Sequence, residues 1–108
     1  VSRYVELDVG QVMVVKSASV VALEALEGTD NTIKRGYRIA GKNCAVFKFS
    51  KANQDLRFDV PVVGLATLNL LKRIGAKALV LEKSKVIILE KIRFLSQAAR
   101  YNIPVIGY

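Results

Sequence analysis

Residues 53–61, with the sequence NQDLRFDVP, form the densest group of chemically active side chains in this protein. They supply two carboxylates, two amides and a guanidinium, on Asp55, Asp59, Asn53, Gln54 and Arg57. Apolar stretches lie on both sides, so the segment connects two buried elements. A connection this rich in hydrogen-bonding groups is typical of a binding or catalytic loop. The alternative is a charged turn in which Arg57 pairs with a neighbouring aspartate.

A second acidic segment, EGTD at 27–30, ends an apolar stretch and precedes a helical pattern. The protein has only nine acidic residues, and four of them are Glu27, Asp30, Asp55 and Asp59. Gly28 permits a sharp turn, and the amide groups of Gly28, Thr29 and Asp30 could bind a phosphate at the start of a helix. The alternative is structural, with Thr29 or Asp30 capping the helix and Asp55 and Asp59 forming salt bridges.

Bringing the two acidic segments together would create a site for metal-assisted phosphate chemistry. If the strands that carry them are neighbours, the four carboxylates share one edge of the sheet, where α/β proteins bind ligands. Mg²⁺ would relieve the repulsion between carboxylates and bridge to phosphate oxygens. Lys48, Lys51 and Arg57 could hold the remaining phosphate charge. A carboxylate not bound to metal could orient or deprotonate an attacking water.

Apolar periodicity predicts the elements that position these segments. Strands are expected over 8–16, 20–26, 44–50, 77–82, 86–89 and 105–107, and helices over 30–40, 64–74 and 90–101. Both faces of the first two strands are expected to be covered, because most of their residues are apolar. Gly41 and Gly75 are expected to end the first two helices, and the apolar residues of the third are Ile92, Leu95, Ala98 and Ala99. Short polar turns predict two hairpins, one joining the first two strands and one joining 77–82 to 86–89. The fold class is therefore α/β, a mixed sheet of about five or six strands with about three packed helices.

Length and composition exclude several classes of protein and of catalytic site. The 108 residues are enough for a single domain, 1–108, and no apolar run reaches the length of a membrane-spanning helix. The one cysteine, Cys44, excludes an internal disulfide and favours a reducing, cytoplasmic setting. The absence of histidine excludes Ser-His-Asp catalysis and His-based zinc sites within this chain. The chain starts with Val1, which suggests a piece of a longer protein.

The net charge of +8 favours an anionic partner. A non-catalytic nucleic-acid-binding module is one alternative, with aromatic side chains available for stacking at Tyr4, Tyr37, Phe47, Phe49 and Phe58. Most of these aromatics lie on apolar stripes, where core packing is the simpler explanation, so nucleic acid is the less favoured partner. A dimerisation or structural domain is the third alternative.

Two motifs make the chain recognisable. DVGQ at 8–11 followed by EGTD at 27–30, and NQDLRFDVP at 53–61, occur in an order that resembles the C-terminal domain of the LpxI family. The resemblance extends from about residue 8 to residue 107. It implies Mg²⁺-dependent hydrolysis of UDP-2,3-diacylglucosamine to UMP and 2,3-diacylglucosamine 1-phosphate (lipid X), in lipid A biosynthesis. It also implies an N-terminal domain, absent from this chain, that completes the substrate site.

The resemblance assigns roles to particular residues. The acidic residues of its motifs correspond to Glu27, Asp30, Asp55 and Asp59, which are expected to be catalytic and metal-binding. Substrate-binding residues are expected at Gly28, Thr29, Lys48, Asn53, Gln54 and Arg57. Basic clusters at 34–35, 72–73 and 83–85 could steer the domain to an anionic membrane surface, as a peripheral protein of the inner membrane. The alternative for these clusters is an ordinary solvated surface.

Overall fold

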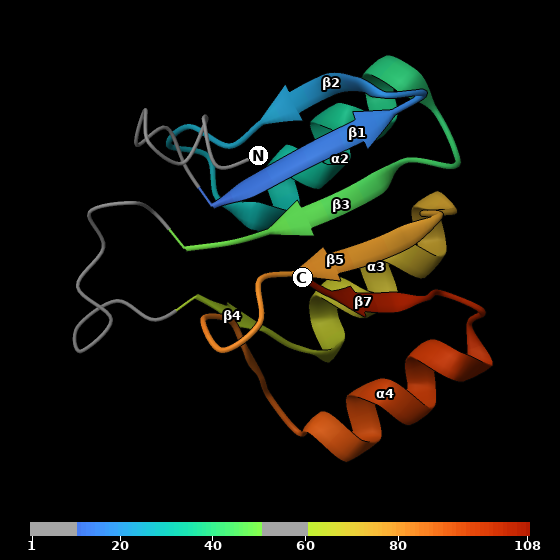
Figure 1. Cartoon of the computed structure of the whole chain (residues 1–108). Coiled ribbons are helices and arrows are strands. Elements are labelled where there is room, and N and C mark those ends of the chain that lie inside the picture. The colour runs from blue at the N-terminus through green and yellow to red at the C-terminus, as the bar shows by residue number, and fades with distance from the viewer. Residues whose placement is uncertain (1–10, 51–60) are drawn as a thin grey trace.

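The structure, a computed structural model, describes residues 11–50 and 61–108. A five-stranded sheet runs through its centre in the order β2-β1-β3-β5-β7 (Figure 1). Its strands are β1 (Val12–Lys16), β2 (Ser19–Leu23), β3 (Ala45–Lys48), β5 (Ala78–Leu81) and β7 (Val105–Gly107). β1 pairs antiparallel with both β2 and β3, whereas β3, β5 and β7 run parallel. The mixed α/β fold expected from the sequence is confirmed.

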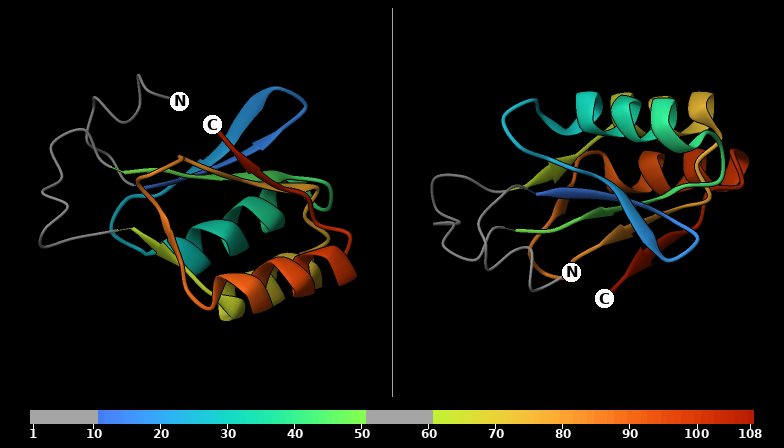
Figure 2. Two further views of the ribbon diagram at one scale, coloured as in Figure 1. Left: turned by 60° about the horizontal axis from the view of Figure 1, so that its bottom comes forward. Right: turned by 90° about the horizontal axis from the view of Figure 1, so that it is seen from above.

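The expected hairpin between β1 and β2 is confirmed, and a turn of two residues joins the strands. Ser17 and Ala18 both have positive φ angles, 52° and 64°, as a two-residue hairpin turn requires. β2 lies at the edge of the sheet, and Val20 on it is exposed. The expectation that both faces of β2 would be covered is therefore wrong for the described residues, because all three helices pack on the same side of the sheet (Figure 2).

Three helices pack on the same side of the sheet: α2 (Thr29–Ala40), α3 (Leu65–Ile74) and α4 (Lys91–Arg100) (Figure 2). Gly41 and Gly75 have φ angles of 77° and 72° and end α2 and α3, as the sequence predicts. The core lies between these helices and the sheet, and includes the fully buried Val14, Ile33 and Leu68. Among the helices within residues 11–50 and 61–108, none has the length and apolar character that a membrane span needs.

The second expected hairpin is wrong. β6 (Ile87–Ile88) pairs in parallel with β4 (Val62–Val63) and forms a separate two-stranded sheet. β5 is already flanked by β3 and β7, so it has no free edge for β6. β4 was not predicted, because two apolar residues between Pro61 and a helix give too short a signal.

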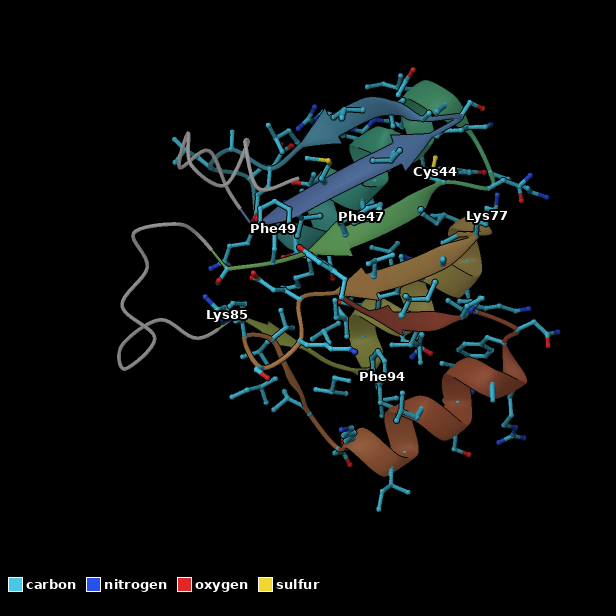
Figure 3. The ribbon with its side chains drawn as sticks, in the orientation of Figure 1. Cys44, Phe47, Phe49, Lys77, Lys85 and Phe94 are labelled. Carbon is cyan, nitrogen blue, oxygen red and sulfur yellow. The ribbon has the colours of Figure 1, made fainter. Side chains whose placement is uncertain are left out.

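The buried side of α4 also differs from the expected one. The sequence pattern favoured Ile92, Leu95, Ala98 and Ala99, whereas the structure buries Phe94 and Ala98 and leaves Ile92 88% exposed. Phe94 lies between α4 and the sheet and is fully buried (Figure 3). Burying this large ring gains more than burying either aliphatic side chain, so Phe94 sets the rotation of the helix.

Candidate functional site

Several sequence-predicted site residues meet at one end of the sheet. β2, β3, β5 and β7 finish at this end, and antiparallel β1 begins there, so we call it the carboxyl edge. Glu24 follows β2, Phe49 and Ser50 follow β3, and Glu82 follows β5. α2 begins beside them. The carboxyl edge therefore collects polar residues from four separate stretches of the chain.

Lys48, the last residue of β3, is the buried cation of this edge. Its side chain is 6% exposed, and its Nζ donates a hydrogen bond of 3.0 Å to Thr29 Oγ1 at the start of α2. Desolvation lowers the pKa of Lys48, while the carboxylates of Glu24 and Asp30 act in the opposite direction. Two of the substrate-binding residues predicted from the sequence, Lys48 and Thr29, are thus in direct contact.

The start of α2 is held by its backbone rather than by a side-chain cap. Gly28 is the N-cap residue with φ 87°, and its carbonyl accepts hydrogen bonds from the Thr32 N–H and Thr32 Oγ1–H. Neither Thr29 nor Asp30 makes a capping hydrogen bond, so the capping alternative considered for them is wrong. Asp30 Oδ1 instead accepts a hydrogen bond of 3.0 Å from Thr67 Oγ1 on α3.

Glu27 forms an ion pair that occupies both of its carboxylate oxygens. Arg35 Nη2 lies 2.5 Å from Oε1 and Arg35 Nε lies 3.2 Å from Oε2. This hydrogen bonding with Arg35 lowers the pKa of Glu27. Arg35 Nη2 also donates to the carbonyl of Leu23 at 2.8 Å, so the pair fixes α2 to the end of β2. Glu27 is therefore paired with Arg35, whereas the carboxylate of Asp30, unlike that of Glu27, contributes to raising the pKa of Lys48.

Two further glutamates hold the backbone at this edge, and sequence reasoning missed both. Glu24 Oε1 accepts the N–H of Gln11 at 2.9 Å. Glu82 Oε1 accepts the N–H and Oγ–H of Ser50 at 2.9 and 3.0 Å. The available signal was their position, since each glutamate follows directly after an apolar strand.

The remaining predicted residues, Asn53, Gln54, Asp55, Arg57 and Asp59, lie outside the described residues, as does Lys51. The residues on either side of this stretch are described. Ser50 is bound by Glu82, and the carbonyl of Pro61 accepts the N–H of Ile87 at 2.9 Å. Both flanks are therefore attached to the same stretch of chain, 82–87.

The described residues alone do not make a complete cation site. Within 11–50 and 61–108, no three Asp, Glu or Cys side chains are grouped closely enough to hold a metal ion. One oxygen of Asp30 and both oxygens of Glu27 already accept hydrogen bonds. Mg²⁺ prefers several oxygen ligands, so oxygen ligands from outside the described residues would be needed to complete a site.

What this edge offers chemically is a place for a phosphate group. A buried lysine, the hydroxyl of Thr29 and the N-terminal end of a 12-residue helix are all attractive to an anion. The aromatics named for nucleic-acid stacking are mostly not available, because Phe49 is buried and Phe47 is half-buried, although Tyr37 is exposed. Tyr4 and Phe58 lie outside the described residues.

Comparison with known proteins finds a protein family and a curated relative that are similar to this chain. A family model described as the LpxI C-terminal domain matches residues 1–106. The UDP-2,3-diacylglucosamine pyrophosphatase LpxI of Caulobacter vibrioides is 30% identical over 109 aligned residues, which cover 94% of this chain and 39% of that protein. The chain therefore spans less than half the length of this relative.

Proposed function

Since the chain belongs to the LpxI family as a C-terminal domain, we propose that it forms part of the active site of a UDP-2,3-diacylglucosamine pyrophosphatase. The reaction would hydrolyse the pyrophosphate bond and give UMP and 2,3-diacylglucosamine 1-phosphate. More than half of the Caulobacter relative lies outside the match, so the rest of the protein, including the family's N-terminal domain, would complete the substrate site.

The observation that carries this proposal is the position of Lys48. A lysine that is 6% exposed, with a pKa lowered by desolvation, adds little to stability, because a buried ammonium loses its hydration. Its contact with Thr29 places it at the N-terminal end of α2, which carries partial positive charge. The carboxylates of Glu24 and Asp30 offset part of this positive charge. A diphosphate, the anion that the family's substrate provides, would offset the rest.

In this proposal, Lys48, Thr29 and the amide groups at the start of α2 bind one phosphate of the substrate. Arg57, Asn53 and Gln54 orient the rest of the sugar nucleotide. Asp55 and Asp59 are the first choices for orienting or deprotonating the attacking water, with Asp30 and Glu27 in supporting roles. These assignments follow the family's motifs.

Mg²⁺ is the proposed cofactor, held by Asp55 and Asp59 with Asp30, and with Glu27 only if its pair with Arg35 opens. When bound, it would polarise the phosphate oxygens and offset their negative charge, which would make the phosphorus more open to attack by water. The ion pair of Glu27 makes this residue the weakest member of the proposed set.

The test is UMP release by the full-length protein with UDP-2,3-diacylglucosamine and Mg²⁺. Lys48→Met should reduce kcat/KM by about 100-fold, in the range found on removing a buried donor to a developing charge. Lys34→Met, at an exposed position on α2, is the matched control and should keep full activity. Equal activity of the two variants would remove Lys48 from the site.

A further inference from the structure

A groove lies between α4, β7 and the connection from β5 to β6. Its volume is about 410 Å³, within the range of small-molecule sites. The lining is mostly apolar, from Leu81, Val86, Ile88, Leu95, Val105 and Ile106. Two cations, Lys83 and Lys91, line the same groove. The Lys83 side chain crosses Gly107 on β7, where a Cβ would lie 2.9 Å from its methylene groups.

Exposed apolar side chains continue from this groove onto α4. Leu95 and Ile106 line it and are both exposed. An adjoining shallow hollow contains Ile92, which is 88% exposed, and shares Lys91 with the groove. We call the set Lys83, Lys91, Ile92, Arg93 and Leu95 the α4 surface. Ile106 is left out because it pairs with Val80, on the face of the sheet opposite the helices. Ile92 and Leu95 do not belong to the buried side of α4, which consists of Phe94 and Ala98.

The charge of the α4 surface is positive. Lys91 and Arg93 lie on either side of Ile92 in the sequence, and Lys83 lies across the groove. Two carboxylates reduce this charge, since Glu90 is 3.4 Å from Arg93 and Glu82 lines the groove. Three cations against two carboxylates leave the surface net positive. Protruding aliphatic side chains flanked by cations are the pattern of a surface that lies at a membrane interface.

The other basic clusters predicted from the sequence do not belong to this surface. Arg35 pairs with Glu27, and Lys72 lies 5.6 Å above the ring of Tyr101, near the C-terminal end of α3. Figure 3 shows Lys77 and Lys85 at opposite ends of the sheet, and the end of α3 is on the Lys77 side. Of the three clusters, only residues 83–85 adjoin the groove.

We propose that the α4 surface docks on a bilayer that contains anionic phospholipids. Ile92 and Leu95 enter the boundary between headgroups and acyl chains, and Lys83, Lys91 and Arg93 contact lipid phosphates. This inference rests on the proposed function for its biological reason, because a diacylated substrate resides in a bilayer. Glu82 borders both the groove and the carboxyl edge, so docking would hold the candidate site next to the lipid.

Vesicle cosedimentation of the full-length protein tests the proposal without any need for hydrolysis. The protein should bind vesicles of phosphatidylcholine with phosphatidylglycerol, and bind pure phosphatidylcholine at least tenfold more weakly. Lys91→Glu should weaken binding by at least about fivefold, the effect of one basic residue near a charged surface. Ile92→Asp should also weaken it. The matched controls are Lys34→Glu and Ile39→Asp, both exposed positions on α2, and these should bind like the wild type.

Two results would overturn the proposal. One is vesicle binding that Lys91→Glu and Ile92→Asp leave unchanged. The other is a change in sedimentation coefficient without vesicles for Ile92→Asp or Leu95→Asp, which would show that another domain or a second copy covers this surface. Vesicle binding and UMP release are separate readouts. UMP release without vesicle binding would mean that docking fails while the proposed function holds. Vesicle binding without UMP release would mean the reverse.

Discussion

Glu82 accepts two hydrogen bonds from Ser50, one from the backbone N–H at 2.9 Å and one from the hydroxyl at 3.0 Å. The two residues are 32 positions apart and follow adjacent parallel strands. Ser50 precedes the polar stretch that holds Asp55 and Asp59, and Pro61 after that stretch is bound by Ile87. Residues 82–87 therefore fix the position of both flanks of the most chemically active part of the chain.

Removing the Glu82 carboxylate should weaken both the fold and the proposed activity. Glu82→Ala leaves the Ser50 N–H and hydroxyl without an acceptor, and should lower the free energy of unfolding by about 1–3 kcal/mol. Glu82→Gln keeps a carbonyl acceptor and should recover part of that loss. Urea unfolding and UMP release, measured on both variants of the full-length protein, check this. Equal stability of Glu82→Ala and wild type would show that this contact does not hold the end of β3.

Lys48→Met should lower the proposed activity without lowering the stability of the fold. An apolar side chain of similar length removes a buried charge, so stability at pH 7 should be unchanged or higher. At the same time, the proposed phosphate contact is lost. Circular dichroism on thermal unfolding measures the first effect, and UMP release measures the second. A large fall in melting temperature would mean that Lys48 is needed for folding rather than for an anion.

The pH dependence of stability gives Lys48 an independent signature. Its pKa is lowered in the folded protein, so between that value and the unfolded value of about 10.4 the unfolded state binds more protons. The free energy of unfolding of the wild type should therefore rise with pH through this alkaline interval, relative to Lys48→Met. Denaturant titrations at several pH values above 7 measure the difference. Parallel curves for the two proteins would contradict the burial of a charged lysine.

Glu27 can be tested as an ion-pair partner or as a metal ligand. If it acts only through Arg35, then Glu27→Gln and Arg35→Gln should affect UMP release alike and leave its Mg²⁺ dependence unchanged. If it binds metal, Glu27→Gln alone should raise the Mg²⁺ concentration for half-maximal activity. The lowered pKa of Glu27 also predicts that the stabilising pair is present at neutral pH and is lost as pH falls through that pKa. We expect the first outcome, because both oxygens of Glu27 contact Arg35.

Gly36 should be required for the contact between α2 and β1. A Cβ at this position would lie 2.7 Å from Val14 Cγ1, too close without movement of one element. Gly36→Ala should therefore destabilise the protein by about 1–2 kcal/mol, because overpacking outweighs the helix propensity of alanine. Adding Val14→Ala should relieve the clash and recover part of the loss. Urea unfolding of the single and double variants measures the coupling, and strictly additive effects would contradict the contact.

Much of the fold could be predicted from the sequence because its signals are local. Apolar periodicity located α3, and Gly41 and Gly75 marked two helix ends correctly. The wrong predictions depended on long-range competition. β6 could not pair with β5 because β3 and β7 already flanked that strand, and α4 turned to bury Phe94 rather than Ile92.

The candidate site was predicted less completely. Sequence analysis identified Thr29 within the EGTD motif and Lys48 as a cation close to the polar stretch, and the structure brings these two residues into contact. Glu82 and Glu24 were missed because a glutamate after a strand has no local feature that shows it will accept a distant backbone N–H. The partner of Glu27 was also beyond local reasoning, since Arg35 reaches it across two turns of α2.

The most direct test of the account is the reaction itself. The full-length protein, incubated with UDP-2,3-diacylglucosamine and Mg²⁺, is predicted to release UMP and 2,3-diacylglucosamine 1-phosphate in equal amounts, and Asp55→Ala and Asp59→Ala to abolish the release without unfolding the protein. Addition of EDTA should stop it. Full activity in both aspartate variants, or no UMP from the wild type under these conditions, would contradict the proposed function.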